Sequence, residues 1–303
     1  MEQDLKALLA KEAQYERKVA AVMRKALDEI RAEMSKIYER YAVDGKLTLA
    51  DMTRYARYTA METNILAKLD PAIRASVGTM KRLTPEQYDA AFFRAAWKID
   101  NETGLALNWG VINTEAIKAA YSIDDPANKA MAEALHNYSL RARRAIRMAI
   151  NDGLAQGKSY YDMMRDIREA LNKTNYEAMR IIRTEGQSAI NAGTADAYDR
   201  ALDEGVEAKV KWSATLDGRT RDQHAAMDGQ ARDEDGMFHF PNGEIAPYPC
   251  WEGLSAENRI NCRCAMRMEI EGYEPQLRRS REQGVIPYRT YAEWEKEYGP
   301  TVH

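Results

Sequence analysis

The chain has 303 residues, which is enough for one large or two ordinary domains with a hydrophobic core in each. Its 44 basic and 47 acidic residues give a net charge of −3, which excludes a protein that binds nucleic acid through its overall charge. No apolar run approaches the roughly 18 residues of a membrane-spanning helix and the N-terminus lacks a signal peptide, so we expect a protein made in a cytoplasm, without a membrane span.

Residues 1–125 are expected to form an N-terminal helical region. Apolar residues recur at three- and four-residue steps over residues 3–42, which predicts one long helix. This helix either packs on its own domain or associates with a second copy. Residues 48–51 resemble a capping box that opens a second helix. The Thr-Pro-Glu-Gln of residues 84–87 indicates the start of another helix, which ends near residue 104.

Residues 126–205 are expected to form a second helical region. A long helix starts at residues 124–126 and is broken at Gly153 and Gly157. Two further helices are predicted over residues 160–171 and 176–204. The helix that starts at residues 124–126 presents one apolar seam, which consists of Met131, Leu135, Tyr138, Ala142, Ala145 and Ala149.

Residues 206–272 have a different pattern, because short stretches alternate polar and apolar side chains between turn residues. Residues 209–212, 237–240 and 265–270 are predicted strands. We therefore expect a small α+β module that contains all the cysteines, followed by a tail over residues 273–303 with one short helix. The predicted fold is mainly α: an elongated N-terminal helical body, then a small C-terminal α+β module of short strands.

The cysteines of the chain, Cys250, Cys262 and Cys264, are confined to this module. With His224 they form a three-cysteine, one-histidine set, which matches the tetrahedral soft-ligand preference of a structural zinc ion. A metal would also add folding free energy to a module with little core. The other interpretation is that the thiols stay reduced and pack as small hydrophobic groups. Alternative ligands in the same region are Asp217, Asp222 and His239.

Residues 217–224 combine acidic, basic and imidazole groups. A catalytic interpretation pairs His224 with Asp217 or Asp222 to activate water, as in a metal-dependent hydrolase or nuclease. The structural interpretation is a turn at Asp217, with neighbouring arginines that neutralise its carboxylate. The structural interpretation is favoured, because no second histidine and asparagine stand at the spacing that a metal-dependent nuclease needs.

Polar residues also form a stripe on the last long predicted helix, at Arg183, Thr184, Glu185, Ser188, Asn191 and Thr194. The stripe either docks the strand module or is a solvated face. Residues 141–183 contain ten basic and five acidic residues. Their excess positive charge is either solvated helix surface or a patch for DNA phosphates. The arginines that would face DNA are Arg141, Arg143, Arg144 and Arg147.

Taken in order, these motifs resemble the phage Mu F-like minor head proteins, also called phage head morphogenesis proteins. The match rests on four places in order: the Arg-Thr-Glu helix, the stretch from Trp212 to His224 with the Asp-Gly that follows, Phe240-Pro241 with the downstream Pro249, and the Asn-Cys-Arg-Cys ending. Arg221 stands where such proteins often have another cysteine, so a metal site here depends on Cys250 and His224. The motif residues are Arg183, Thr184, Glu185, Trp212, Asp217, Arg219, His224, Asp228, Gly229, Asn261, Cys262 and Cys264.

The resemblance implies a non-enzymatic virion protein that lies inside the head near the portal and assists DNA packaging or delivery. It implies assembly in the host cytoplasm with the portal protein, other head proteins and phage double-stranded DNA as partners. Self-association through the N-terminal helices is a further expectation. The alternatives are the metal-dependent hydrolase described above and an effector that is ejected into the host with the genome.

Overall fold

The computed structural model describes residues 2–53, 56–105, 107, 109, 129–272, 276–280, 283–290, 292, 293 and 296. The chain forms two compact units that alternate along the sequence. We call Leu5–Leu83 with Ala120–Ile182 the helical unit, and Met1–Asp4 with Thr84–Ala119 and Arg183–His303 the module unit. The four consecutive regions expected from the sequence stay a prediction. The expected fold class is confirmed, since long helices precede short antiparallel strands.

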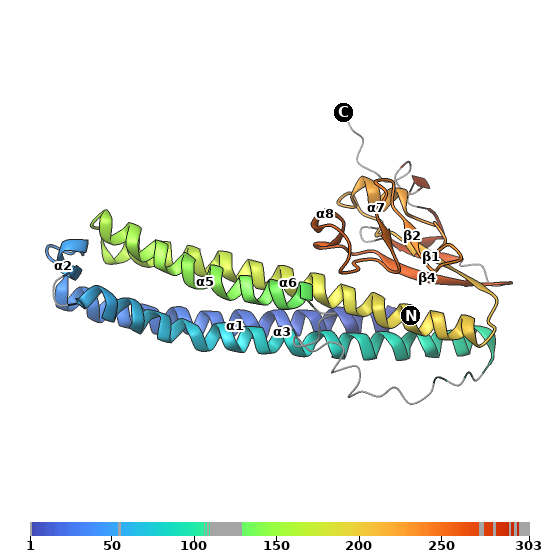
Figure 1. Cartoon of the computed structure of the whole chain (residues 1–303), viewed down its shortest axis with the longest axis horizontal. Coiled ribbons are helices and arrows are strands. Elements are labelled where there is room, and N and C mark those ends of the chain that lie inside the picture. The colour runs from blue at the N-terminus through green and yellow to red at the C-terminus, as the bar shows by residue number, and fades with distance from the viewer. Residues whose placement is uncertain are drawn as a thin grey trace. The chain divides into compact units, whose positions relative to one another are not determined.

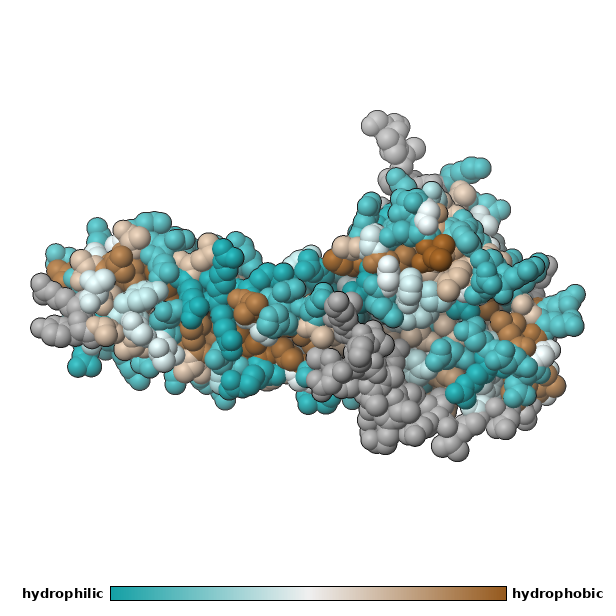
Figure 2. Space-filling view, in the orientation of Figure 1, coloured by the Kyte–Doolittle hydropathy of each residue, from teal (hydrophilic) through white to brown (hydrophobic). Residues whose placement is uncertain are grey.

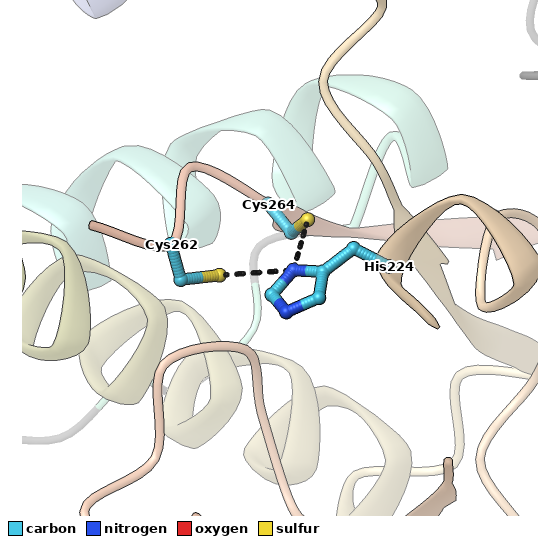
Figure 3. A group of neighbouring side chains, drawn as sticks. All are labelled: His224, Cys262 and Cys264. Carbon is cyan, nitrogen blue, oxygen red and sulfur yellow. Dashed lines mark hydrogen bonds between the residues drawn. The ribbon is translucent and has the colours of Figure 1, made fainter. Parts of the chain in front are cut away.

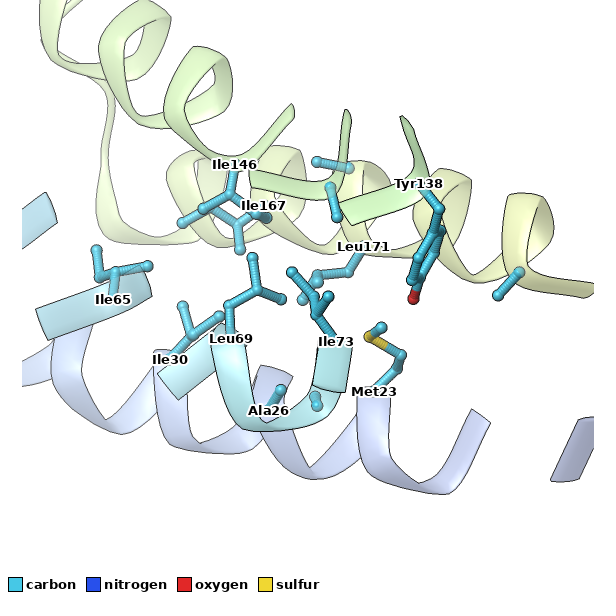
Figure 4. Close-up of a cluster of buried hydrophobic side chains, with 14 of the residues drawn as sticks. Met23, Ala26, Ile30, Ile65, Leu69, Ile73, Tyr138, Ile146, Ile167 and Leu171 are labelled. Atoms are coloured by element: carbon cyan, nitrogen blue, oxygen red, sulfur yellow. The ribbon is translucent and has the colours of Figure 1, made fainter. Parts of the chain in front are cut away.

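The helical unit is built from segments of four long helices, α1 (Glu2–Tyr41), α3 (Arg57–Thr103), α5 (Lys129–Ala155) and α6 (Tyr160–Asp203), with the short α2 (Leu49–Thr53) between the first two (Figure 1). Each long helix turns an apolar face toward one shared core. Figure 4 shows part of this core, including Met23, Ile30, Ile65, Leu69, Tyr138, Ile146, Ile167 and Leu171.

The expected capping box at the start of α2 is confirmed. The Thr48 backbone N–H donates to Asp51 Oδ2 at 3.0 Å, and the Asp51 N–H donates back to Thr48 Oγ1 at 3.3 Å. In α5, the expected seam holds through Ala142 and then moves to Ile146 and Ile150, because Ala145 and Ala149 are only partly buried.

Two expected helix boundaries are wrong. Residues 84–87 do not start a helix, because they lie inside α3. The structure buries Thr84 and Gln87 there, and this packing outweighs the backbone hydrogen bond that Pro85 cannot make. The expected break between residues 171 and 176 is also absent, since α6 is continuous. Thr174 is buried in it, and its hydroxyl donates to the Ala170 carbonyl at 2.9 Å.

Of the two glycines expected to break α5, Gly153 does not, because it lies inside this helix, which ends at Ala155. Gly157 follows that end, with a φ of 59°. A Cβ at Gly153 would lie 2.4 Å from Cε of Met163 in α6, so the glycine permits close packing of these helices. No helix in the described part of the chain is both long and apolar enough to cross a bilayer. The face seen in Figure 2 is mostly hydrophilic, with apolar residues in small patches.

The described strands all belong to the module unit, and they form three antiparallel pairs. β1 (Ala208–Ser213) pairs with β4 (Ala265–Ile270), and the register places Trp212 opposite Met266. β2 (Phe238–His239) pairs with β3 (Ile245–Ala246), and β5 (Leu277–Ser280) pairs with β6 (Gly284–Pro287). The short helices α7 (Asp222–Ala226) and α8 (Ala256–Arg259) lie between strands in the sequence. β1, β2 and β4 match expected strands.

The hairpin of β5 and β6 was not expected, because two of the four residues of β5 are arginines, Arg278 and Arg279. The short helix expected in the tail falls partly outside the described residues. Among those described, residues 292, 293 and 296 are helical. The Thr290 N–H donates to Glu293 Oε2 at 2.8 Å and the Glu293 N–H to Thr290 Oγ1 at 3.4 Å, which is the pattern of a capping box.

Candidate metal centre

The buried ring of Trp212 organises the module core. Phe238 and Phe240 each meet it edge to face, with ring centroids 5.2 Å apart, and the His224 ring meets it at 6.0 Å. The neighbouring backbone is tied to the same strand, since Trp212 N–H donates to the Gln230 carbonyl at 2.8 Å and Gly229 N–H donates to the Trp212 carbonyl at 2.9 Å. The aromatic side chains thus fix the orientation of the imidazole.

His224 of α7 points its Nδ1 at two cysteine sulfurs (Figure 3). Nδ1 lies 3.3 Å from Sγ of Cys264 and 3.6 Å from Sγ of Cys262. On the other side of the ring, Arg221 Nη1 lies 3.4 Å from Nε2. Because a guanidinium can only donate, this contact favours a metal-free tautomer with the proton on Nδ1.

Cys250 is adjacent to this group through the sulfur of Cys262, with which it shares a hydrogen bond. Its own thiol donates to the carbonyls of Thr184 and Arg259, each at 3.3 Å. Cys250 and Asn261 have left-handed backbones, with φ of 68° and 55°. Non-glycine residues adopt this conformation at a cost, so the surrounding contacts must hold the cysteine-bearing turns in place.

The thiols are poor nucleophiles in this environment. Hydrogen bonding to the Cys250 thiol and burial raise the pKa of Cys262 to about 12. Hydrogen bonding to Cys262 and complete burial raise the pKa of Cys264, and His224 offsets only part of that effect. In the absence of a metal these cysteines are therefore neutral thiols at pH 7, which argues against thiolate chemistry.

The carboxylates proposed for a hydrolase are not assembled around His224. Among the described residues, the group of metal-type donors consists of His224, Cys262 and Cys264, all buried and with donor atoms within 4.8 Å of one another. Asp217 and Asp222 lie outside this group, and so does His239, whose Nε2 lies 2.5 Å from Asp233 Oδ2. The alternative ligands expected from the sequence therefore do not converge on it.

Asp217 instead anchors a turn, but the arginine that binds it most closely is the distant Arg263, and the neighbouring Arg221 donates to the Ile260 carbonyl. Arg263 binds the Asp217 carboxylate with both guanidinium nitrogens, one of them at 2.8 Å, and the Arg219 N–H donates at 3.0 Å. Burial opposes ionisation of Asp217, but these hydrogen bonds outweigh it and lower the pKa below 3.8. The Arg219 side chain itself is mostly exposed.

Asp228, another motif residue, joins the first strand to the tail. Its carboxylate accepts hydrogen bonds from the Ala214 N–H at 2.8 Å and from both terminal nitrogens of Arg278 at 2.7 and 2.8 Å. The sequence did not indicate Arg278, which belongs to β5. A buried acid needs a buried cation, but sequence alone does not say which arginine supplies it.

The polar stripe of α6 docks the module. Asn191 Nδ2 donates to the carbonyls of Pro249 at 2.8 Å and Cys264 at 3.0 Å, and Thr184 Oγ1 accepts from the Asn261 N–H at 3.1 Å. These contacts fix the backbone on either side of the cysteines. Arg183 is exposed on the same helix.

A buried ion pair reinforces this docking. Arg259 Nη2 of α8 binds both carboxylate oxygens of Glu185, at 2.8 and 2.7 Å. Burial raises the pKa of Glu185 above its usual value, and Arg259 counteracts part of that rise. The pair therefore fastens α8 to α6 at a desolvation cost.

The arginines expected to face DNA are mostly engaged within the helical unit. Arg143 Nε lies 2.9 Å from Asp70 Oδ1, while Arg141 pairs with Glu177 and Arg147 with Glu62. Arg144 is exposed. A DNA-binding role for these four residues stays a prediction.

Comparison with known proteins finds sequence similarity to one family. Residues 144–267 match the family described as Phage Mu protein F like protein. The chain is 28% identical over 288 residues to the minor head protein GP7 of Bacillus phage SPP1, covering 94% of this chain and 92% of that protein.

A second relative is a longer protein. The chain is 26% identical over 294 residues to the NAD(+)–arginine ADP-ribosyltransferase EFV of Enterococcus faecalis (strain ATCC 700802 / V583), covering 92% of this chain but only 60% of that protein. No solved structure matches the chain. The resemblance expected from the sequence motifs is nevertheless confirmed, because the chain is similar to the Mu F-like family over residues 144–267 and to a phage minor head protein over nearly its whole length.

Proposed function

We propose that the chain is a minor head protein that takes part in head morphogenesis of a tailed phage. The observation that carries this proposal is the similarity to the SPP1 minor head protein, which extends over nearly all of both chains. The module unit supports a structural rather than a catalytic role, because its motif residues form hydrogen bonds and ion pairs that connect helices and strands. Asp217, Asp228 and Glu185 each bind an arginine.

We further propose that the protein acts inside the head near the portal, where it contacts other head proteins and assists DNA packaging or delivery. Exposed apolar side chains on α3 support a protein-binding role: Phe93 is 54% and Trp97 is 60% exposed. Large aromatic groups of this kind are enriched at protein interfaces. The charged surfaces of the long helices would make further polar contacts with other head proteins.

Co-assembly tests the role directly. The tagged chain would be produced together with the portal and scaffold proteins of its phage, and assembled heads would be isolated and analysed by mass spectrometry. We expect the chain in purified heads and cross-linked to the portal protein. Absence from purified heads would overturn the head role, whereas a chain that is packaged in heads but leaves them on infection and enters the host cell would favour the ejected effector.

A catalytic role is less well supported, because His224 faces thiols and Asp217 is bound by Arg263. Purified protein would be incubated with plasmid DNA and Mg²⁺, Mn²⁺ or Zn²⁺, and separately with NAD⁺ and an arginine-containing acceptor. We expect no nicking and no ADP-ribosyl transfer. Metal-dependent nicking that is lost in His224→Ala would establish the hydrolase instead.

A further inference from the structure

The donor atoms around His224 already have the spacing of a tetrahedral zinc site. With Zn–S of about 2.3 Å and Zn–N of about 2.0 Å, the sulfur and nitrogen ligands of one zinc ion lie about 3.5 Å apart. The observed distances from His224 Nδ1 to Cys264 Sγ and Cys262 Sγ are 3.3 and 3.6 Å. Three corners of the tetrahedron are thus preformed by buried side chains.

We propose that the module binds one structural zinc ion through His224 Nδ1, Cys262 Sγ and Cys264 Sγ, with Cys250 Sγ as the fourth ligand. Cys250 lies against Cys262, and its thiol is held by two carbonyl oxygens at 3.3 Å. Its sulfur is not part of the group whose donor atoms lie within 4.8 Å of one another, so coordination requires a change of the Cys250 side-chain torsion that exchanges these weak hydrogen bonds for a metal bond. This proposal is independent of the head role proposed above.

The chemistry of the donors indicates which metal is bound and what it does. Three sulfurs and one imidazole nitrogen are a soft set that suits zinc better than magnesium or calcium. Four protein ligands leave no position for water, and all the cysteines and the histidine are buried. The site is therefore structural rather than catalytic.

Metal binding would change the contact between His224 and Arg221. Coordination by Nδ1 requires the proton to move to Nε2, which then faces the donor nitrogen of Arg221 now 3.4 Å away. Arg221 keeps its second hydrogen bond, to the Ile260 carbonyl, while Nη1 turns aside. Its positive charge then offsets the net −1 of a zinc ion with three thiolates.

The zinc ion would connect three segments that are distant in sequence: α7, the turn at Cys250 and the turn before β4. The latter two are also bound to α6 by hydrogen bonds that do not involve the thiols: Asn191 donates to the carbonyls of Pro249 and Cys264, and Thr184 Oγ1 accepts from the Asn261 N–H. Metal binding would therefore stabilise the docked form of the module, with a rise in melting temperature that depends on the free zinc concentration.

Metal content tests the proposal on the full chain purified without chelator. We expect about one zinc per chain, loss of the metal in the Cys262→Ser/Cys264→Ser variant, and weakened binding in Cys250→Ser. His239→Ala is the matched control, because His239 is an exposed histidine of the same module outside the group, and it should keep its zinc. Loss of zinc in His239→Ala with retention in the double variant would overturn the proposal.

A second measurement does not depend on variants that fold. The wild-type chain would be stripped with a chelator and titrated with Zn²⁺ while the ¹⁵N shifts of the His224 ring and the melting temperature are recorded. We expect a switch from the Nδ1–H to the Nε2–H tautomer and a higher melting temperature at one equivalent. A folded, stripped chain that shows neither change with micromolar Zn²⁺ refutes the site.

Discussion

Gly193 lies where a side chain would collide with the backbone of a neighbouring helix. A Cβ there would lie 2.4 Å from the backbone oxygen of Tyr88, which cannot move without displacing α3. We predict that Gly193→Ala lowers the free energy of unfolding by about 1–3 kcal/mol, as expected for overpacking. Urea unfolding followed by circular dichroism measures the effect.

Gly78 provides the control for this substitution. It also lies inside a long helix, α3, but a Cβ there would meet nothing within 4 Å. Gly78→Ala should raise stability by about 0.5–1 kcal/mol, because alanine loses less backbone entropy in a helix. Equal effects of the two substitutions would contradict the close approach at Gly193.

Glu244 makes the stability of the module depend on pH. Hydrogen bonds from Asn258 and Asn242, with another from the Ser255 N–H at 2.8 Å, lower its pKa from 4.5 to about 2. Because the folded state holds the proton less tightly than the unfolded state, the stabilisation is complete above pH 4.5. It is lost as the pH falls from 4.5 towards 2.

Unfolding midpoints in urea between pH 2 and pH 7 test this prediction. Wild type should lose stability through that acidic window, and Glu244→Gln should be less stable at pH 7 and show a smaller loss on acidification. Glu234→Gln is the control, because Glu234 is an exposed glutamate of the same unit. Parallel pH profiles for wild type and Glu244→Gln would rule out the assigned pKa.

At the scale of elements, Asn191 of α6 decides how firmly the module is docked. Its amide nitrogen donates to two carbonyls, those of Pro249 and Cys264. Asn191→Asp keeps the shape of the side chain but turns the donor into an acceptor facing two acceptors. We predict a loss of about 2–4 kcal/mol, because buried polar groups are left unpaired next to a charge.

Hydrogen exchange followed by mass spectrometry locates this loss. In Asn191→Asp, exchange should increase around residues 249–264, whereas the helical unit should keep wild-type protection. Thr194→Val is the control, since the Thr194 hydroxyl donates only to the Ile190 carbonyl of its own helix. Uniform acceleration over the whole chain would show that Asn191 does not act locally.

Sequence periodicity predicted the long helices and three of the strands, because their apolar faces repeat over many residues. It failed where tertiary packing outweighs a local signal, as at Pro85 inside α3 and Thr174 inside α6. The β5–β6 hairpin was missed because Arg278 is a strand residue whose charge is neutralised by a distant acid. Local patterns carry no information about such partners.

The candidate site was predicted only in part. Clustering in the sequence pointed to the cysteines and His224, and the structure brings His224, Cys262 and Cys264 together. The sequence could not indicate that the Asp217 carboxylate forms an ion pair with Arg263, because an acidic residue near the cysteines serves equally well as a metal ligand or as a turn anchor. Pairing of this kind depends on the fold of residues about 46 positions apart.

For the whole molecule, DNA binding should depend on few of the expected arginines. Arg144 is exposed, whereas Arg143 is held by Asp70. We predict that Arg144→Ala reduces the slope of log affinity against log salt concentration by about 0.9, the value for one phosphate contact. Arg143→Ala should leave the slope unchanged. Fluorescence anisotropy with a labelled duplex measures both, and a wild-type affinity independent of salt would exclude this contact.

The alternation of the two units along the chain limits how the protein can be divided. The module unit takes α3 from Thr84 onward and α6 from Arg183 onward, so each unit consists of separated stretches of sequence. A clone that begins at residue 206 would omit Asn191 and Thr184, which bind the cysteine-bearing turns. No single cut yields either unit complete, and a shortened form of the module must retain both helix segments, joined by a designed linker.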